Sequence, residues 1–236
     1  MTEHTVSAYD EELTAIAGRI AEMGGIAEDI VTNAVGALIS QDLDRAQATI
    51  LKDARLDELL VDIEMRNVNV IARRQPMGQD LREIMAAGRI ANDLERVGDM
   101  AKNVAKRVIA IDSDLKSKKL AIGVEHMTEL ALAQLKDVLD AYTRRDAEEA
   151  RKVRDRDSEV DAIYTSLFRE LLTYMMEDPR NITQCAHLLF CAKNIERIGD
   201  HATNIAENVY YMVTGERLTD ERPRMDETGV VDSEEA

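Results

Sequence analysis

The string ERVGDMAKNVA at residues 95–105 returns as ERIGDHATNIA at residues 196–206, 101 positions later. The likeness continues on both sides, because residues 93–94 and 108 have similar counterparts at 194–195 and 209. A specific string repeated about half a chain length apart indicates an internal duplication. The sequence therefore predicts two copies of one unit, a first repeat over residues 1–111 and a second repeat over residues 112–215.

Hydrophobic residues recur at helical spacing along nearly the whole chain, which predicts an all-α protein. Each repeat has three long apolar-periodic stretches separated by turns, so the expected fold is two tandem three-helix bundles of six long antiparallel helices. The predicted helices run from about Tyr9 to Ser40, Asp42 to Arg73, Asp80 to Ala110, Leu115 to Arg144, Asp146 to Met176, and onward to about Val213. Residues 216–236 form an acidic tail that we expect to be disordered.

Composition narrows the class of protein. Aromatic residues make up 3% of the chain and prolines number three, so the core must be aliphatic and most of the chain is free to be helical. A net charge of −16 argues against a nucleic-acid partner, which needs a basic face. Two cysteines lie six positions apart on one expected helix, which predicts no disulfide and favours the reducing cytoplasm. No apolar run is long enough to span a membrane, so we expect any membrane contact to be peripheral and through partners.

Four acid-xxx-acid pairs occupy matching places in the two repeats. In the first repeat, one pair lies 23 and 19 residues before Pro76 and the other lies 19 and 23 residues after it. Residues equally far from the turn of a helical hairpin lie at the same height, and residues four apart share a helix face. The prediction is a square of four carboxylates in each repeat: Asp53, Asp57, Glu95 and Asp99 in the first, and Asp157, Asp161, Glu196 and Asp200 in the second.

Four carboxylates a few Å apart repel one another and need a counter-charge. One solution is an ionic network, with Arg96 and Arg197 nearby in the sequence. The other is a metal, since all-oxygen ligands suit hard cations such as Mg²⁺, Mn²⁺, Ca²⁺ or iron, with Zn²⁺ also possible. Asn103 and Asn204 extend each stripe by one turn and are possible extra ligands. Spacing alone leaves these two solutions open, and nothing in the sequence indicates an organic cofactor.

The duplicated ER-hydrophobe-GD string, together with the paired acids upstream of it, resembles the PhoU family over about residues 7 to 214. The resemblance implies a cytoplasmic negative regulator of the phosphate-starvation response and of high-affinity phosphate uptake. It also implies an adaptor that contacts the ATPase subunit of the phosphate ABC transporter and a sensor histidine kinase. Some members bind multinuclear metal clusters, and the eight acids above are the positions that match. We further expect a homodimer.

Two other classes of function stay open at this stage. One is a carboxylate-bridged metalloenzyme, but such bundles use Glu-x-x-His pairs and none of the four histidines follows a glutamate at that spacing. The other is a purely structural helical protein whose acids form salt bridges only. No phosphate-cradling Gly-rich loop, nucleotide motif or Ser-His-Asp arrangement is recognisable. The sequence therefore predicts no enzymatic activity and no dedicated phosphate pocket.

Overall fold

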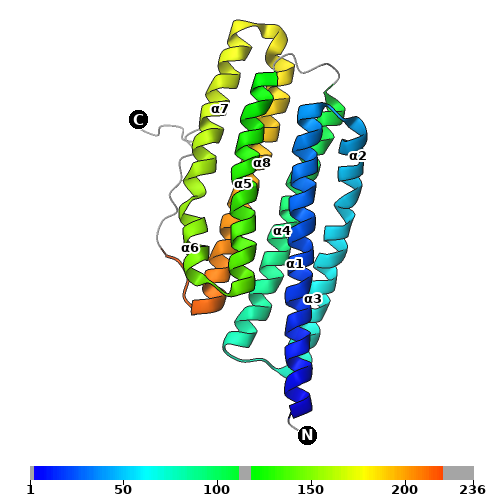
Figure 1. The fold of residues 1–236 in the computed structure, drawn as a ribbon, viewed down its shortest axis with the longest axis vertical. Coiled ribbons are helices and arrows are strands. Elements are labelled where there is room, and N and C mark those ends of the chain that lie inside the picture. Colours follow the sequence, from blue (N-terminus) through cyan, green and yellow to red (C-terminus); the bar gives the residue numbers. More distant parts are fainter. Residues whose placement is uncertain (1–2, 112–117, 220–236) are drawn as a thin grey trace, which may run out of the picture.

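The computed structural model describes residues 3–111 and 118–219, and within them the chain is almost entirely helical (Figure 1). The first repeat contains α1 (Glu3–Ser40), α2 (Leu43–Lys52), α3 (Ala54–Arg74) and α4 (Gln79–Ala110). The second contains α5 (Lys118–Arg144), α6 (Ala147–Asp155), α7 (Asp157–Glu177), the short 3-10 helix η1 (Pro179–Asn181) and α8 (Ile182–Thr214). The predicted acidic tail lies outside the described residues from position 220 onward.

The predicted fold class is confirmed, with one difference. The middle helix of each repeat is a rod interrupted at a single residue, which divides it into α2 and α3 at Asp53 and into α6 and α7 at Arg156. Asp53 keeps helical dihedral angles, whereas Arg156 has φ −90° and ψ 3°. Both interruptions fall at the first acid pair of the repeat, so each helical rod is broken at the edge of its carboxylate cluster.

The helix boundaries follow from local chemistry. Asp42 and Asp146 cap the second rod of each repeat, because their side chains accept hydrogen bonds from the backbone N–H groups of Arg45 and Glu149. Gly215 ends α8 with φ +78°, in the left-handed conformation that glycine adopts without strain. The two capping aspartates are 104 positions apart, so residues of the first two helical rods of each repeat correspond when they are 104 positions apart.

The two bundles share one core. Helix α4 packs against α8 and α1 packs against α5, so each repeat contributes two helices to the contact. The buried apolar side chains of both repeats form a single continuous cluster. Polar contacts also cross the boundary: His201 Nδ1 on α8 lies 3.0 Å from Asp93 Oδ1 on α4, and Arg145, just after α5, pairs with Glu83 on α4 at 2.7 Å. The repeats are therefore halves of one folded unit.

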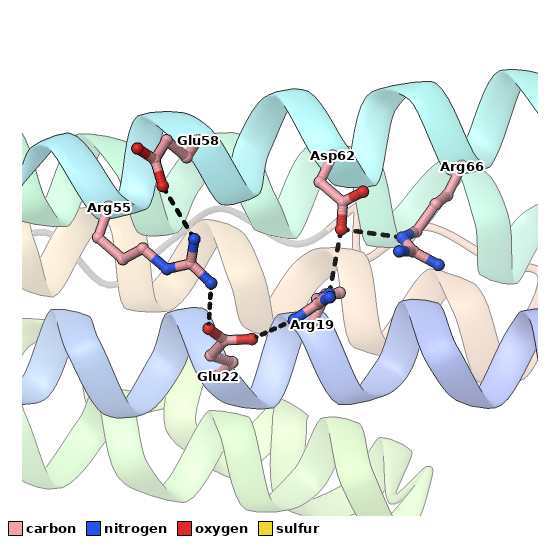
Figure 2. A network of polar contacts seen from close by, with 6 residues as sticks. All are labelled: Arg19, Glu22, Arg55, Glu58, Asp62 and Arg66. Carbon is pink, nitrogen blue, oxygen red and sulfur yellow. Dashed lines mark hydrogen bonds and ion pairs between the residues drawn. The ribbon is translucent and has the colours of Figure 1, made fainter.

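Ion pairs bind the outer surface of the first repeat (Figure 2). Arg55 on α3 reaches Glu22 on α1 at 2.7 Å, and Arg19 on α1 reaches Asp62 on α3 at 3.0 Å. Further ion pairs within α3, from Arg55 to Glu58 and from Arg66 to Asp62, and one within α1, from Arg19 to Glu22, complete the network. These side chains are a third to two thirds exposed, so each pair contributes only a few tenths of a kcal/mol up to about 1 kcal/mol.

Two smaller expectations can also be compared with the structure. Cys185 and Cys191 are both free, as their spacing predicted, and both are buried. Among the described residues, no helix has the length and apolarity that a membrane crossing requires.

Candidate carboxylate clusters

The first cluster, Asp53, Asp57, Glu95 and Asp99, lies between the α2–α3 junction and α4. Two of its members come together, because Lys102 Nζ bonds both Asp53 and Asp99, the latter at 2.6 Å. Asp53 is only 3% exposed, whereas Asp57 lies at the solvent side. The equal-height argument is therefore confirmed for the Asp53 and Asp99 pair. It did not identify Lys102, which follows Asp99 by three residues on the same helix.

Lys102 sets the protonation of the first cluster. Burial opposes the charge of Lys102, but its two carboxylate partners outweigh burial and hold its pKa above the ordinary value. Burial likewise opposes ionisation of Asp99, yet the hydrogen bond from Lys102 holds the pKa of Asp99 below its usual range. Glu95 differs, since burial and the charge of Asp99 raise its pKa against the opposing pull of Arg96. A lysine ammonium thus supplies much of the counter-charge that a cation would otherwise provide.

Gly98 permits this close arrangement. A Cβ at Gly98 would lie 2.3 Å from Leu56 Cδ1 and 3.0 Å from Asp53 Oδ1. The first distance is too short for a methyl group and the second is tight, so a side chain at residue 98 would force Leu56 to move. Gly199 is different, because a Cβ there would meet Val160 Cγ1 at 3.5 Å, an ordinary contact. The duplicated glycine is thus packed more tightly in the first repeat than in the second.

The second cluster, Asp157, Asp161, Glu196 and Asp200, lies between the start of α7 and α8. Glu196 is 6% exposed, and its Oε1 accepts a hydrogen bond from Lys193 Nζ at 3.0 Å. Its other oxygen, Oε2, is buried and has no hydrogen-bond partner. Burial, together with the charges of Asp200 and Asp161, raises the pKa of Glu196 to about 7, although Lys193 opposes the shift. The second cluster therefore contains a carboxylate whose negative charge is poorly compensated.

Two neutral oxygen-bearing side chains border the second cluster. Thr203 Oγ1 donates a hydrogen bond to Asp157 Oδ1 at 2.9 Å, and both residues are buried. Gln134 on α5 is fully buried and donates through Nε2 to the backbone oxygen of Arg156, the residue just before Asp157. Gln134 Oε1 has no partner and lies 3.6 Å from where a Cβ of Gly199 would be. Sequence reasoning missed both residues.

The donor chemistry of these residues fits a hard cation better in the second cluster than in the first. Within the described residues, no group of three or more His, Cys, Asp and Glu side chains is arranged to hold a metal ion without rearrangement. In the first cluster Lys102 already bridges two of the carboxylates that a metal would need. In the second, an unpaired carboxylate oxygen and an unpaired amide oxygen are suitable ligands for a hard cation. Metal ligation by the eight acids stays a prediction.

The extra ligands proposed from the sequence lie at the ends of the two stripes. Asn103 is half-buried on α4. Asn204, also half-buried, lines a groove of about 950 Å³ between α3, α4, α8 and the segment that follows α8. None of the eight cluster carboxylates lines this groove. Its charged lining is mixed, with Arg89 and Arg217 beside three acids, so it is not a basic cradle for phosphate.

Comparisons with known proteins agree with the duplicated architecture. A family model described as the PhoU domain matches the chain twice, at residues 20–108 and 124–209. A phosphate-specific transport system accessory protein PhoU homolog of Rhizobium meliloti is 60% identical, over 98% of this chain and 97% of the relative. Its counterpart in Caulobacter vibrioides is 51% identical, over 96% and 98%.

Solved structures show the same likeness. The crystal structure of PhoU from Pseudomonas aeruginosa has a TM-score of 0.84 at 38% identity and covers 88% of this chain and 100% of its own. The structure of the phosphate transport system regulatory protein PhoU from Streptococcus pneumoniae has a TM-score of 0.82 at 27% identity, covering 89% and 99%. Both repeats of the present chain are thus represented in a known fold.

Proposed function

The chain belongs to the PhoU family, and on that premise we propose that it is a non-enzymatic negative regulator of high-affinity phosphate uptake and of the phosphate-starvation response. It acts as an adaptor between the ATPase subunit of the phosphate ABC transporter and a sensor histidine kinase, and it works as a homodimer. The observation that carries this proposal is the 60% identity, over 98% of the chain, to a relative named as a phosphate transport accessory protein.

Metal binding is the second part of the proposal. The carboxylate clusters bind a hard divalent cation or iron, and the ion stabilises the paired helices rather than reacting with a substrate. Three features support a binding role: the acids lie between helices, oxygen is the donor atom throughout, and one buried carboxylate oxygen lacks a partner. Phosphate status reaches the protein through protein contacts. A tight, saturable phosphate isotherm on the isolated protein would contradict that statement.

The regulatory role is tested by deleting the gene in its own host and growing the cells with ample phosphate. We expect phosphate uptake and a phosphate-starvation reporter to rise in the deletion strain and to return to the parental level on complementation. Affinity capture of the full chain should recover the transporter ATPase and the sensor kinase. Unchanged uptake and an unchanged reporter in the deletion strain would refute the proposal.

The metal part is tested on the same samples by elemental analysis of the native protein and of the double variant Asp99→Ala/Asp200→Ala. We expect metal to fall in the double variant while both partners are still captured, a result that would separate the metal sites from the docking surfaces. A protein that never carries metal would favour the purely structural alternative. Phosphoester hydrolysis that depends on the bound metal would favour the metalloenzyme alternative.

A further inference from the structure

The two repeats differ at the positions that surround their carboxylates. The duplicated strings align Lys102 with Thr203, 101 positions apart. In the first repeat that position holds an ammonium bonded to Asp53 and Asp99, and in the second it holds a neutral hydroxyl bonded to Asp157. This position therefore holds a positive charge in the first repeat and a neutral oxygen in the second. The ammonium of the second repeat, Lys193, contacts Glu196 from the position that aligns with Asn92.

A second difference lies on the first rod of each repeat. The capping aspartates Asp42 and Asp146 place residues 104 positions apart in register, so Gln134 corresponds to Ile30. Ile30 is a fully buried apolar side chain, whereas Gln134 is a fully buried amide whose Oε1 has no partner. A buried polar atom without a partner costs free energy unless something binds it. The change again adds an oxygen to the second cluster.

We infer that the repeats have divided their roles: the second cluster alone binds a hard cation, and Lys102 takes the place of that cation in the first. This rests on the metal-binding part of the proposed function and makes it specific to one site. The ligating set comes from Asp157, Asp161, Glu196 and Asp200, with Gln134 and Thr203 as neutral oxygen groups at its border.

The chemistry of the two environments supports this division. A metal entering the first cluster must displace an ammonium that already bridges two carboxylates on neighbouring elements. A metal entering the second cluster meets Glu196 Oε2 and Gln134 Oε1, two buried oxygens that have no other partner. Lys193 does contact Glu196, but through Oε1, and its side chain is 43% exposed.

The test exchanges the two aligned residues in the full chain. Metal-stripped wild type, Lys102→Thr and Thr203→Lys are each titrated with Mn²⁺, with free Mn²⁺ followed by electron paramagnetic resonance. We expect the wild type to bind at one class of tight site. Thr203→Lys should weaken that site by about tenfold or more, the scale on which supporting residues affect metal affinity. Lys102→Thr should add a second class of site.

Matched variants guard against misfolding, since Thr203 is fully buried and Thr203→Lys can fail to fold. Glu196→Gln should weaken the wild-type site while the corresponding Glu95→Gln leaves it unchanged, and helical circular dichroism checks the fold of each. Equal loss in both, or loss only in Glu95→Gln, would overturn the division of roles and leave metal binding itself intact. No Mn²⁺ binding by the wild type or by Lys102→Thr would overturn both this inference and the metal part of the proposed function.

Discussion

Replacing Glu196 with glutamine should stabilise the metal-free protein at neutral and alkaline pH. The pKa of Glu196 rises from 4.5 to about 7 in the folded state because burial disfavours its charge. Between those two values the folded protein binds more protons than the unfolded chain, so the free energy of unfolding falls as pH rises. The penalty is absent below about pH 4.5 and complete above about pH 7.

The size of the effect follows from the same shift. One pKa unit corresponds to about 1.4 kcal/mol, so a shift from 4.5 to about 7 gives an upper limit of about 3 kcal/mol. Side-chain relaxation and water entry reduce it, and about 1–2 kcal/mol is the expected gain for Glu196→Gln at pH 8. Glutamine keeps an oxygen for the Lys193 hydrogen bond and places an amide where Oε2 has no partner.

The assay is urea unfolding followed by circular dichroism at pH 5, 6, 7 and 8, with a chelator present throughout. The difference between Glu196→Gln and wild type should grow from pH 5 to about pH 7 and then level off. Glu95→Gln is the matched control, and its gain should be smaller because Arg96 partly offsets the shift at Glu95. A loss of stability in Glu196→Gln that is the same at every pH would refute the reasoning.

Three further outcomes are expected from thermal or urea unfolding of the metal-free protein. Gly98→Ala should destabilise by about 1–3 kcal/mol, because its new Cβ would overlap a leucine methyl of α3, while Gly199→Ala should be neutral or gain up to about 1 kcal/mol. Equal losses in the two would contradict this. Lys102→Met should lower the free energy of unfolding by about 1–3 kcal/mol, less than the loss of a fully buried pair, because the Lys102 side chain is 22% exposed. An unchanged free energy of unfolding would show that Lys102 does not neutralise its cluster. A double-mutant cycle of Asp93→Ala and His201→Ala should give a coupling energy of about 0.5–1.5 kcal/mol across the repeat boundary. If the two single losses of stability simply add, the contact does not contribute to stability.

Much of the fold was accessible from the sequence because helical periodicity and duplication are both long-range signals. Counting from Pro76 placed Asp53 level with Asp99, and the structure bears this out through their shared lysine. Register along a helix can be counted, but its rotation and its neighbours are set by packing. For that reason Gln134, which comes from a third helix, could not be associated with the acids.

Lys102 could have been found from the sequence. It lies within the duplicated string, and aligning the two copies residue by residue shows lysine opposite threonine in an otherwise similar stretch. The backbone interruptions at Asp53 and Arg156 are different, because neither residue is a glycine or a proline and no local signal marks them. There the path of the chain depends on how the rod packs over α4 or α8.

The continuous core has a consequence for how such a duplicated chain can be divided. Helices α4 and α8 pack against each other, and the buried aliphatic residues run unbroken from one bundle to the other. Cutting the chain between the repeats would expose the apolar faces of two long helices at once. Each fragment would then bind another apolar surface in place of the missing repeat. Separately expressed repeats should therefore aggregate or self-associate, whereas co-expressed repeats should assemble into the complete fold.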